Sequence, residues 1–159
     1  MSTGARRVLS VTLRPATAED CRWIWLWRND PETRRASFDS SPIPFETHEA
    51  WFRATLEGKD RRLYVILADS METGVVRLDV SGREAEVSIH LAPESRFRGV
   101  GSAAIQGMVD LAFGPLGLER LVARTKLDNQ ASVAAFERAG FTREEARTVV
   151  TLVKSRAGA

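Results

Sequence analysis

Alternating apolar and polar residues mark several short stretches of the chain as β-strands. A period of two places apolar side chains on one face of a strand, and proline, glycine and polar turns bound each stretch. The expected strands cover residues 8–14, 63–68, 75–80, 86–91, 121–125 and 148–153. Short polar connections at 70–74 and 81–83 are typical of hairpins. We therefore expect an antiparallel meander in the middle of the chain.

A helical period of apolar residues predicts helices between these strands. They cover residues 17–29, 46 or 47 to about 56, 102–113 and 129–138. Thr17 is a typical helix cap, and Gly58 and Gly140 are typical stop residues. Residues 32–44 have no clean period, so we expect a long connection there that is either functional or mobile. The sum is an α/β (α+β) fold, with a mixed, mostly antiparallel sheet of six or seven strands and about four helices.

Length and composition favour a single domain that binds neither nucleic acid nor membrane. The 159 residues suit one domain, with its core at about 9–153. The net charge of +2 comes from scattered residues, which does not favour nucleic-acid binding. No apolar run approaches the roughly 20 residues of a membrane helix, and residues 1–10 lack the apolar segment of a secretion signal. We expect a cytoplasmic protein.

The only cysteine, Cys21, excludes an internal disulfide and a cysteine-rich zinc site, and no metal is expected. It stands among apolar residues of the first predicted helix, which favours a structural thiol. The alternative is an acyl-accepting nucleophile in a two-step transfer.

The stretch 84–104 has the order strand, basic glycine turn and helix start, which suits a pyrophosphate. The N–H groups of a helix's first turn have no partner inside the helix, and the helix dipole adds positive charge there. Gly99 and Gly101 let the main chain approach a phosphate, while Arg96 and Arg98 add charge and forked donors. The glycines also match a dinucleotide-binding fingerprint, but a polar insert at 93–98 separates them from the strand.

Two blocks of the sequence resemble the GNAT family of N-acetyltransferases. The first, Arg96-x-x-Gly99-x-Gly101, is similar to the acetyl-CoA signature of that family. The second, over 121–141, matches the family pattern at Asn129, Ser132, Phe136 and Gly140-Phe141. The resemblance covers about residues 9–153. It implies that the fourth and fifth strands splay apart and that acetyl-CoA, as co-substrate, lies in the V between them.

The resemblance also assigns contacts to acetyl-CoA. Main-chain groups near Ile89 and Leu91 would bond the pantetheine like an added strand, and Asn129 would contact the same arm. The pyrophosphate would lie beside Arg96 on the N–H groups of Arg98, Gly99, Val100, Gly101 and Ser102. Phe136 would flank the cofactor, where many family members have a tyrosine that protonates the leaving thiolate. Ser132 is the replacement donor that we consider, with water alone as the alternative.

The implied chemistry is direct attack of an amine on a thioester, which needs an oriented carbonyl and stabilised charge on oxygen. A base or a water chain is required because a typical amine is mostly protonated near neutral pH. Glu86, Ser88 and His90 fall on one face of the fourth strand. If this face lines a cleft, Glu86 is our first choice for the base and His90 the second. The alternative is that these side chains face solvent or are satisfied by neighbours.

Two further segments, 27–30 and 45–52, bear on the acceptor. They resemble the family branch that acetylates the 4-amino group of nucleotide-linked 4-amino-4,6-dideoxy sugars, and acetyltransferases of ribosomal-protein N-termini share part of the pattern. The expected acceptor-binding residues are Trp27, Arg28, Asn29, His48 and Trp51. Arginines would bind phosphates and aromatic faces a base or sugar ring, although His48 and Trp51 also suit a cap and a core position.

We therefore expect an acetyl-CoA-dependent N-acetyltransferase that acts on a primary amine of a small molecule, with a nucleotide-linked amino sugar as the best guess. The alternatives are an N-terminal acetyltransferase of a ribosomal protein and a non-catalytic module that binds acetyl-CoA. The protein is expected to be a monomer or a homodimer.

Overall fold

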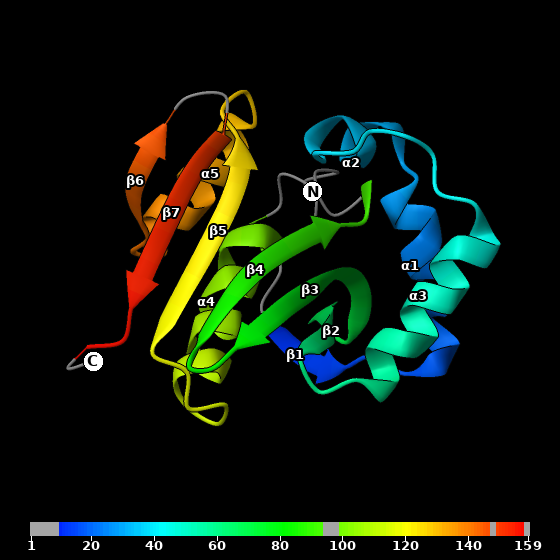
Figure 1. Ribbon diagram of the computed structural model, residues 1–159, viewed down its shortest axis with the longest axis horizontal. Helices are drawn as coiled ribbons and strands as arrows, with labels where there is room; N and C mark the ends of the chain where they lie inside the picture. The colour runs from blue at the N-terminus through cyan, green and yellow to red at the C-terminus, as the bar shows by residue number, and fades with distance from the viewer. Residues whose placement is uncertain (1–9, 94–98, 147–148, 158–159) are drawn as a thin grey trace, which may run out of the picture.

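A seven-stranded sheet runs through the molecule in the order β1-β2-β3-β4-β5-β7-β6 (Figure 1). The structure, a computed structural model, describes residues 10–93, 99–146 and 149–157. The strands are β1 Val11–Pro15, β2 Arg61–Ala68, β3 Met71–Ser81, β4 Glu84–Leu91, β5 Arg120–Lys126, β6 Thr142–Ala146 and β7 Val149–Ser155. Neighbouring strands are antiparallel except β4 and β5, which run parallel. The expected mixed, mostly antiparallel sheet is confirmed.

The strand that the alternation did not predict is β6. It pairs with β7 at the edge of the sheet, and its side chains Thr142, Arg143 and Glu144 are exposed. A strand without a buried face carries no apolar alternation, so its sequence looks like a loop. The strand β6 is therefore recognised by its pairing with β7 and not by its sequence pattern.

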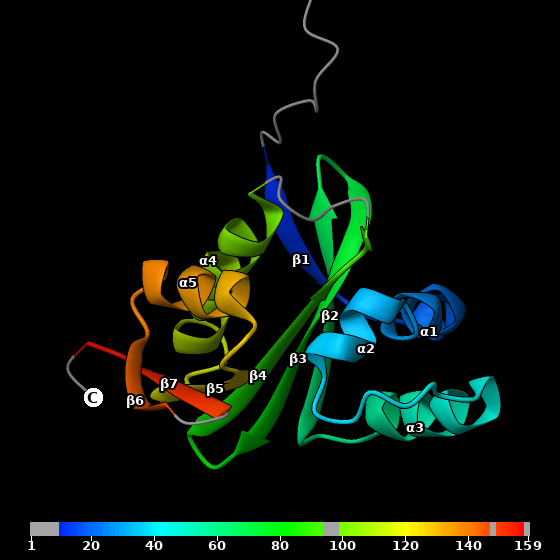
Figure 2. The ribbon, with the colours of Figure 1, turned by 90° about the horizontal axis from the view of Figure 1, so that it is seen from above.

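Helices cover both faces of the sheet (Figure 2). A short 3-10 turn, Ala18–Asp20, leads into α1 Cys21–Arg28, and with α2 Pro31–Ala36 and α3 Phe45–Glu57 these lie on one face. The helices α4 Val100–Phe113 and α5 Gln130–Arg138 lie on the other. The four expected helices are confirmed, and Gly58 follows α3 as a C-cap.

The helix α2 corrects our expectation of an irregular connection over 32–44. The Asp30 carboxylate accepts hydrogen bonds from the N–H groups of Glu32 and Thr33, at 3.1 and 3.2 Å. Pro31 follows at the first helical position, where its missing N–H costs nothing. Asp30-Pro31 therefore ends one helix and starts the next. Six residues are too few to show a period, but the cap and proline were a readable start signal.

Two apolar clusters hold the layers together. The larger lies between the sheet and α4 and α5, with Ile66, Leu78, Leu121, Leu152, Ile105 and Met108 among its members. The smaller lies under α1 and α3 and contains Ile24, Phe52, Leu63 and Val75. Because β2 and β3 contribute to both clusters, the middle of the sheet is buried on both faces.

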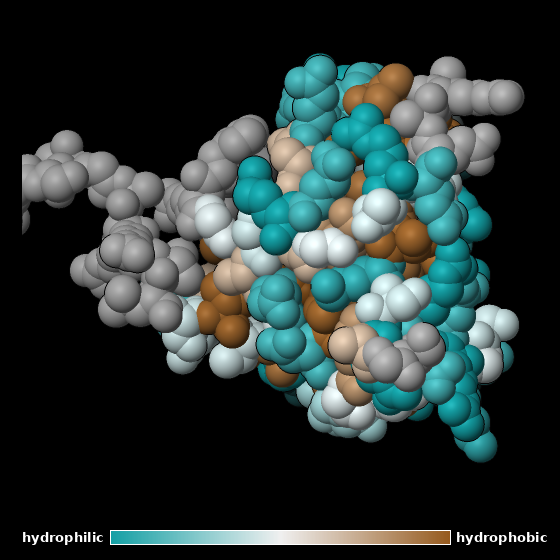
Figure 3. Space-filling view, turned by 90° about the vertical axis from the view of Figure 1, so that its left-hand side faces the viewer, coloured by the Kyte–Doolittle hydropathy of each residue, from teal (hydrophilic) through white to brown (hydrophobic). Residues whose placement is uncertain are grey.

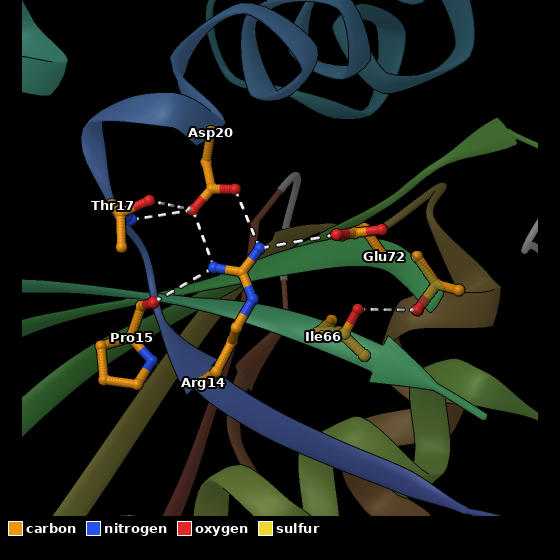
Figure 4. A network of polar contacts seen from close by, with 7 residues as sticks. Arg14, Pro15, Thr17, Asp20, Ile66 and Glu72 are labelled. Carbon is orange, nitrogen blue, oxygen red and sulfur yellow. Dashed lines mark hydrogen bonds and ion pairs between the residues drawn. The ribbon is translucent and has the colours of Figure 1, made fainter. Parts of the chain in front are cut away.

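Arg14 fastens the first helical layer to the sheet (Figure 4). Its guanidinium donates two hydrogen bonds to the two oxygens of the Asp20 carboxylate, at 2.8 and 2.9 Å. Asp20 also accepts from the N–H of Thr17 at 2.8 Å, and Glu72 lies 3.7 Å from the Arg14 guanidinium. Burial raises the pKa of Asp20, but these hydrogen bonds outweigh burial and leave the pKa below its usual value.

The sheet opens between β4 and β5. Their pairing covers Glu84 to Val87 against Arg120 to Ala123 and then ends, although β4 continues to Leu91 and β5 to Lys126. On the side of this gap, the last residues of both strands pair with no other strand of the described chain. The expected splay of the fourth and fifth strands is confirmed.

The face that carries β6 and β7 at the left of Figure 1 is mainly hydrophilic (Figure 3). Hydrophobic side chains show through it as separate areas between hydrophilic ones. Within residues 10–93, 99–146 and 149–157, no helix is long and apolar enough to span a membrane.

Candidate active site

Two cavities meet where β4 and β5 separate. The first, which we call the α4 cavity, has about 460 Å³ and lies between the end of β4, the start of α4 and α5. The second, the arginine cavity, has about 290 Å³ and lies under α2 and the segment that follows it. The residues that line both are Thr33, Ala36, Ile89, His90, Asn129 and Ser132. A molecule in one cavity therefore lies beside a molecule in the other.

The start of α4 forms one end of the α4 cavity. Gly99 is the N-cap with a φ of 78°, a conformation that favours glycine, and no atom would lie within 4 Å of an added Cβ. Gly99, Gly101 and Ser102 line the cavity, so the free N–H groups of the first helical turn lie beside it. Arg96 and Arg98 lie outside the described residues.

An arginine from α5 adds charge at the same place. The Arg138 guanidinium donates to Ser102 Oγ at 3.3 Å, and Arg138 lines the α4 cavity. A helix N-terminus with an adjacent guanidinium suits a pyrophosphate. Sequence reasoning missed Arg138, because only the packing of α5 beside α4 brings it to the glycine turn.

The long walls of the α4 cavity come from β4 and α5. Ile89 and Leu91 line it on the β4 side, at the edge that has no β5 partner. On the other side, Asn129 Oδ1 accepts from the N–H of Ser132 at 3.3 Å, which caps α5. An open strand edge facing a capped helix can hold an extended chain by main-chain hydrogen bonds.

Two expected cofactor contacts lie away from this cavity. Val100 is buried in the larger apolar cluster, so only its main chain can serve a ligand. Phe136 is also buried, packs edge-on against Phe141 with ring centres 5.0 Å apart, and lines the arginine cavity. The hydrocarbon ring of Phe136 cannot donate a proton; Ser132, the donor considered from the sequence, lies at the junction of the cavities, where Thr33 carries a second hydroxyl.

The arginine cavity is strongly cationic. Its lining includes Arg28 from α1, Arg34 from α2, Arg77 from β3 and Arg124 from β5. Asp39 is the one carboxylate among its described lining residues. Opposite charge within a partly enclosed site strengthens attraction, so this cavity favours a molecule that carries negative charge.

Arg28 is held in place by two aromatic side chains behind it. Its guanidinium carbon lies 4.6 Å from the ring centre of Trp51, and Nη1 lies 3.3 Å from His48 Nδ1. His48 Nε2 lies 3.0 Å from the Cys21 carbonyl, so Nε2 carries the proton and Nδ1 accepts from Arg28. Burial and the charge of Arg28 lower the pKa of His48 to about 4. His48 is therefore neutral at physiological pH.

The two expected bases lie in different places. His90 lines both cavities at their junction. Glu86 forms an ion pair with Arg124 at 2.8 Å and lines a third cavity of about 320 Å³, with Asp79 and Glu84. The strand register confirms that Glu86, Ser88 and His90 share one face of β4, opposite Asp79, Arg77 and Val75 of β3. Their catalytic roles stay predictions.

Of the five expected acceptor residues, Arg28 alone lines the arginine cavity. Trp27 packs against Trp23, with ring centres 4.2 Å apart. Asn29 holds Ile43 through two hydrogen bonds of 2.8 Å, and His48 and Trp51 stand behind Arg28. Arg77 and Arg124 were missed because single arginines in strands carry no sequence signal for a shared cavity.

The remaining reactive groups lie outside these cavities. Cys21 is half-buried, and burial followed by the charge of Glu49 raises the pKa of its thiol, which fits a structural thiol. In the described part of the chain, no three His, Cys, Asp or Glu side chains are placed to hold a metal ion.

The chain is similar in sequence to known proteins. Residues 10–142 match the model of a family described as an acetyltransferase (GNAT) domain. Spermidine N(1)-acetyltransferase of Escherichia coli (strain K12) is 25% identical over 138 residues, covering 85% of this chain and 74% of that one. Acetyltransferase PseH of Campylobacter jejuni is 21% identical over 126 residues, covering 79% and 78%.

Solved structures share the fold. Spermidine N-acetyltransferase from Vibrio cholerae, in complex with CoA and spermine, superposes with a TM-score of 0.84 at 23% identity, covering 92% of this chain and 96% of that one. Aminoglycoside acetyltransferase AAC(6')-Ib, in complex with coenzyme A, gives 0.82 at 20% identity, covering 93% and 96%.

Proposed function

Because the chain belongs to the GNAT family of acetyltransferases, and is thus an acetyl-CoA-dependent N-acetyltransferase, we propose that its acceptor is a nucleotide-linked amino sugar. The observation that carries this proposal is the cationic cavity that meets the α4 cavity at β4. The two phosphates of a nucleotide sugar match its arginines. Spermidine and aminoglycosides are polycations, and four arginines oppose their binding.

The residues of the two cavities have different roles in this proposal. The start of α4 and Arg138 would hold the pyrophosphate of acetyl-CoA, and the open edge of β4 with Asn129 would hold its pantetheine. Acetyl-CoA supplies the thioester: the amine attacks its carbonyl carbon, the C–N bond forms, and the C–S bond breaks. His90 and Ser132 both line the junction of the cavities, which supports a role for His90 in taking the amine's proton and for Ser132 in protonating the thiolate. Glu86, acting directly or through water, stays our first choice for the base, with His90 as the second.

The experiment measures coenzyme A release with four acceptors at equal concentration. They are a nucleotide-linked 4-amino-4,6-dideoxy sugar, spermidine, an aminoglycoside and a peptide with a free N-terminus. We expect the nucleotide sugar to give the highest kcat/KM, by at least tenfold. Faster transfer to spermidine or to the peptide contradicts the proposal. Binding of acetyl-CoA without turnover on any acceptor would favour a non-catalytic module.

A matched pair of glycine variants isolates the cofactor site. Gly99 and Gly117 both have positive φ, 78° and 64°, and both have open space where a Cβ would lie. Gly99 lines the α4 cavity and Gly117 does not. Saturation at about 100 times Kd adds about 2.7 kcal/mol to stability, so acetyl-CoA should raise the melting temperature by several degrees. We expect Gly99→Glu to abolish that shift and Gly117→Glu to keep it.

The cytoplasmic location and the oligomeric state stay predictions of this proposal. Light scattering with and without acetyl-CoA distinguishes a monomer from a homodimer, and cell fractionation tests the location.

A further inference from the structure

Two arginines of the arginine cavity lie close together, and the one carboxylate that pairs with either of them in the described structure is shared with a third arginine. The guanidinium carbons of Arg28 and Arg77 lie 4.6 and 6.0 Å from the ring centre of Trp51. Both residues line the cavity, one from the end of α1 and the other from β3. Two like charges that share one indole repel each other, and the geometry is stable only if another contact offsets that repulsion.

The protein's own carboxylates supply little of that offset. The described residues place no carboxylate in an ion pair with Arg28, whose contacts are neutral His48 and Trp51. Arg77 Nε lies 3.4 Å from an oxygen of Asp79, but Arg61 lies 3.3 Å from the other oxygen of the same carboxylate. Burial, and then the charge of Arg77, lower the pKa of Arg28. The pair therefore has the electrostatics of an incomplete anion site.

The other two arginines of the cavity have partners already. Arg124 is in an ion pair with Glu86 at 2.8 Å. Arg34 donates to the main-chain carbonyls of Asn29 and Ser40, at 3.1 and 3.4 Å. Those carbonyls are neutral, so the charge of Arg34 adds to that of Arg28 and Arg77 in attracting an anion.

The strand register relates the position of Arg77 to that of His90, at the junction of the two cavities. Arg77 is directly opposite Ser88 on β4, and its Nη2 lies 3.4 Å from Ser88 Oγ. His90 lies two residues further along the same face, at the junction with the α4 cavity. Two residues of a strand span about 7 Å. An anion at Arg77 therefore lies on the order of 7 Å from the junction at His90, a separation that a six-membered ring with a substituent at each end can span.

We propose that Arg77 and Arg28 form the subsite for a phosphate-type anion of the acceptor, with the amine on the opposite side of a single ring. This inference rests on the proposed function and adds to it a specificity-determining residue, Arg77. Asp79 forms an ion pair with the Nε side of Arg77 at 3.4 Å, although Nε makes no hydrogen bond in the described structure, and Nη2 reaches Ser88 in the cavity. A forked guanidinium held in this way binds a phosphate more selectively than a lysine does.

The kinetic test uses one amino sugar in two forms, the 4-amino sugar 1-phosphate and its neutral methyl glycoside. The readout is the ratio of kcat/KM for the phosphate to kcat/KM for the glycoside. We expect Arg77→Gln to lower this ratio at least tenfold. The matched control is Arg61→Gln, because Arg61 contacts the same Asp79 yet lies outside the arginine cavity. An equal ratio in wild type and Arg77→Gln overturns the inference.

A binding test needs no turnover and separates this inference from the proposed function. The protein is first saturated with coenzyme A, so that its own phosphate site is filled, and inorganic pyrophosphate is then titrated by calorimetry. Binding that weakens at least tenfold in Arg77→Gln, but not in Arg61→Gln, supports the subsite even if no amine is acetylated. Unchanged binding overturns the subsite even if acetyl transfer proceeds. If the Gln variant fails to fold, Arg77→Lys should still weaken binding at least threefold.

Discussion

His48 shows how a single residue acts on a cavity that it does not line. Its Nδ1 lies 3.3 Å from Arg28, while its ring is fully buried between the Cys21 carbonyl and the aromatic rings of α3. Because the imidazole is neutral, it accepts a hydrogen bond from Arg28 without repelling it. A protonated ring would lose that contact and add a third positive charge. His48 is therefore a positioning residue for Arg28.

The titration of His48 predicts a loss of stability in mild acid. Its pKa is about 4 in the folded protein, against about 6.5 in an unfolded chain. Between these values the unfolded state binds more protons, so the free energy of unfolding falls as pH is lowered from about 6.5 to 4, by at most about 1.4 kcal/mol per pH unit. Urea unfolding at pH 7, 6 and 5 measures this slope.

The matched variant is His48→Gln, which keeps a polar group but cannot titrate. At pH 7 we expect it to be less stable by about 1–3 kcal/mol, because a buried partner is lost. Its slope between pH 6.5 and 4.5 should be shallower, and its acceptor KM should rise while the KM for acetyl-CoA does not. A slope equal to that of the wild type would show that His48 does not titrate as described.

At the scale of elements, the segment from α2 to the start of α3, which we call the cover, lines the arginine cavity. Hydrogen bonds join its two ends. Asn29 bonds both the N–H and the carbonyl of Ile43 at 2.8 Å, and Trp25 Nε1 donates to the same carbonyl at 2.7 Å. The chain between them supplies Thr33, Arg34 and Phe38 to the cavity wall. Lys126 Nζ, across the V on β5, donates to the Arg35 carbonyl at 2.8 Å.

Because Asn29 joins the two ends of the cover, we expect its substitution to weaken acceptor binding more than acetyl-CoA binding. In Asn29→Ala both hydrogen bonds to Ile43 are lost, the two ends of the cover separate more easily, and we expect the acceptor KM to rise by about three- to thirtyfold. The KM for acetyl-CoA should change less than the acceptor KM, because the start of α4 and Arg138, which would hold the pyrophosphate, lie outside the cover. Asn29→Asp, which can keep the bond from the Ile43 N–H, should give an intermediate value. Equal losses in both KM values would point to general unfolding instead.

Whether the sequence could predict a feature depends on how far apart in the chain the interacting residues lie. The strands with a buried face, and the helices α1, α3, α4 and α5, follow from local periodicity, and the glycine turn at Gly99 follows from the spacing of its residues. Within the cover, the sequence carries a recognisable structural signal only at Asp30-Pro31, the start of α2. Arg28, Arg77 and Arg124 meet through register and packing across the sheet, so their cavity depends on distances that no local pattern records.

At the scale of the whole molecule, polar contacts help to hold the helical layer of the acceptor side against the sheet. Arg14 and Asp20 form one of them, and the Asp20 side chain is only 5% exposed. We expect Asp20→Asn to lower the free energy of unfolding by about 3 kcal/mol, because it removes the buried carboxylate and leaves Arg14 only the more distant Glu72, at 3.7 Å. Chemical unfolding at pH 7 measures the difference.

Glu137→Gln is the control for that prediction. Glu137 and Arg143 form an ion pair at 3.1 Å, but both side chains are about 40% exposed, so its loss should cost less than about 1 kcal/mol. Because the pKa of Asp20 is lowered, its contribution is present above the ordinary aspartate pKa and is lost as pH falls through the lower, folded value. Acid unfolding below about pH 4 should therefore be less steep in Asp20→Asn. Equal effects of the two variants would contradict this account.

The open V has a consequence for the protein when it is empty. From Ser88 to Leu91 the edge of β4 that faces the gap has no strand partner among the described residues, and neither has the end of β5 on its side of the gap. Such edges are templates on which strands of other molecules can add, and proteins usually protect them. A bound pantetheine arm would occupy this edge as a temporary strand. Bound acetyl-CoA would then protect this edge from strand addition. The ligand-free protein would be the form most prone to aggregate.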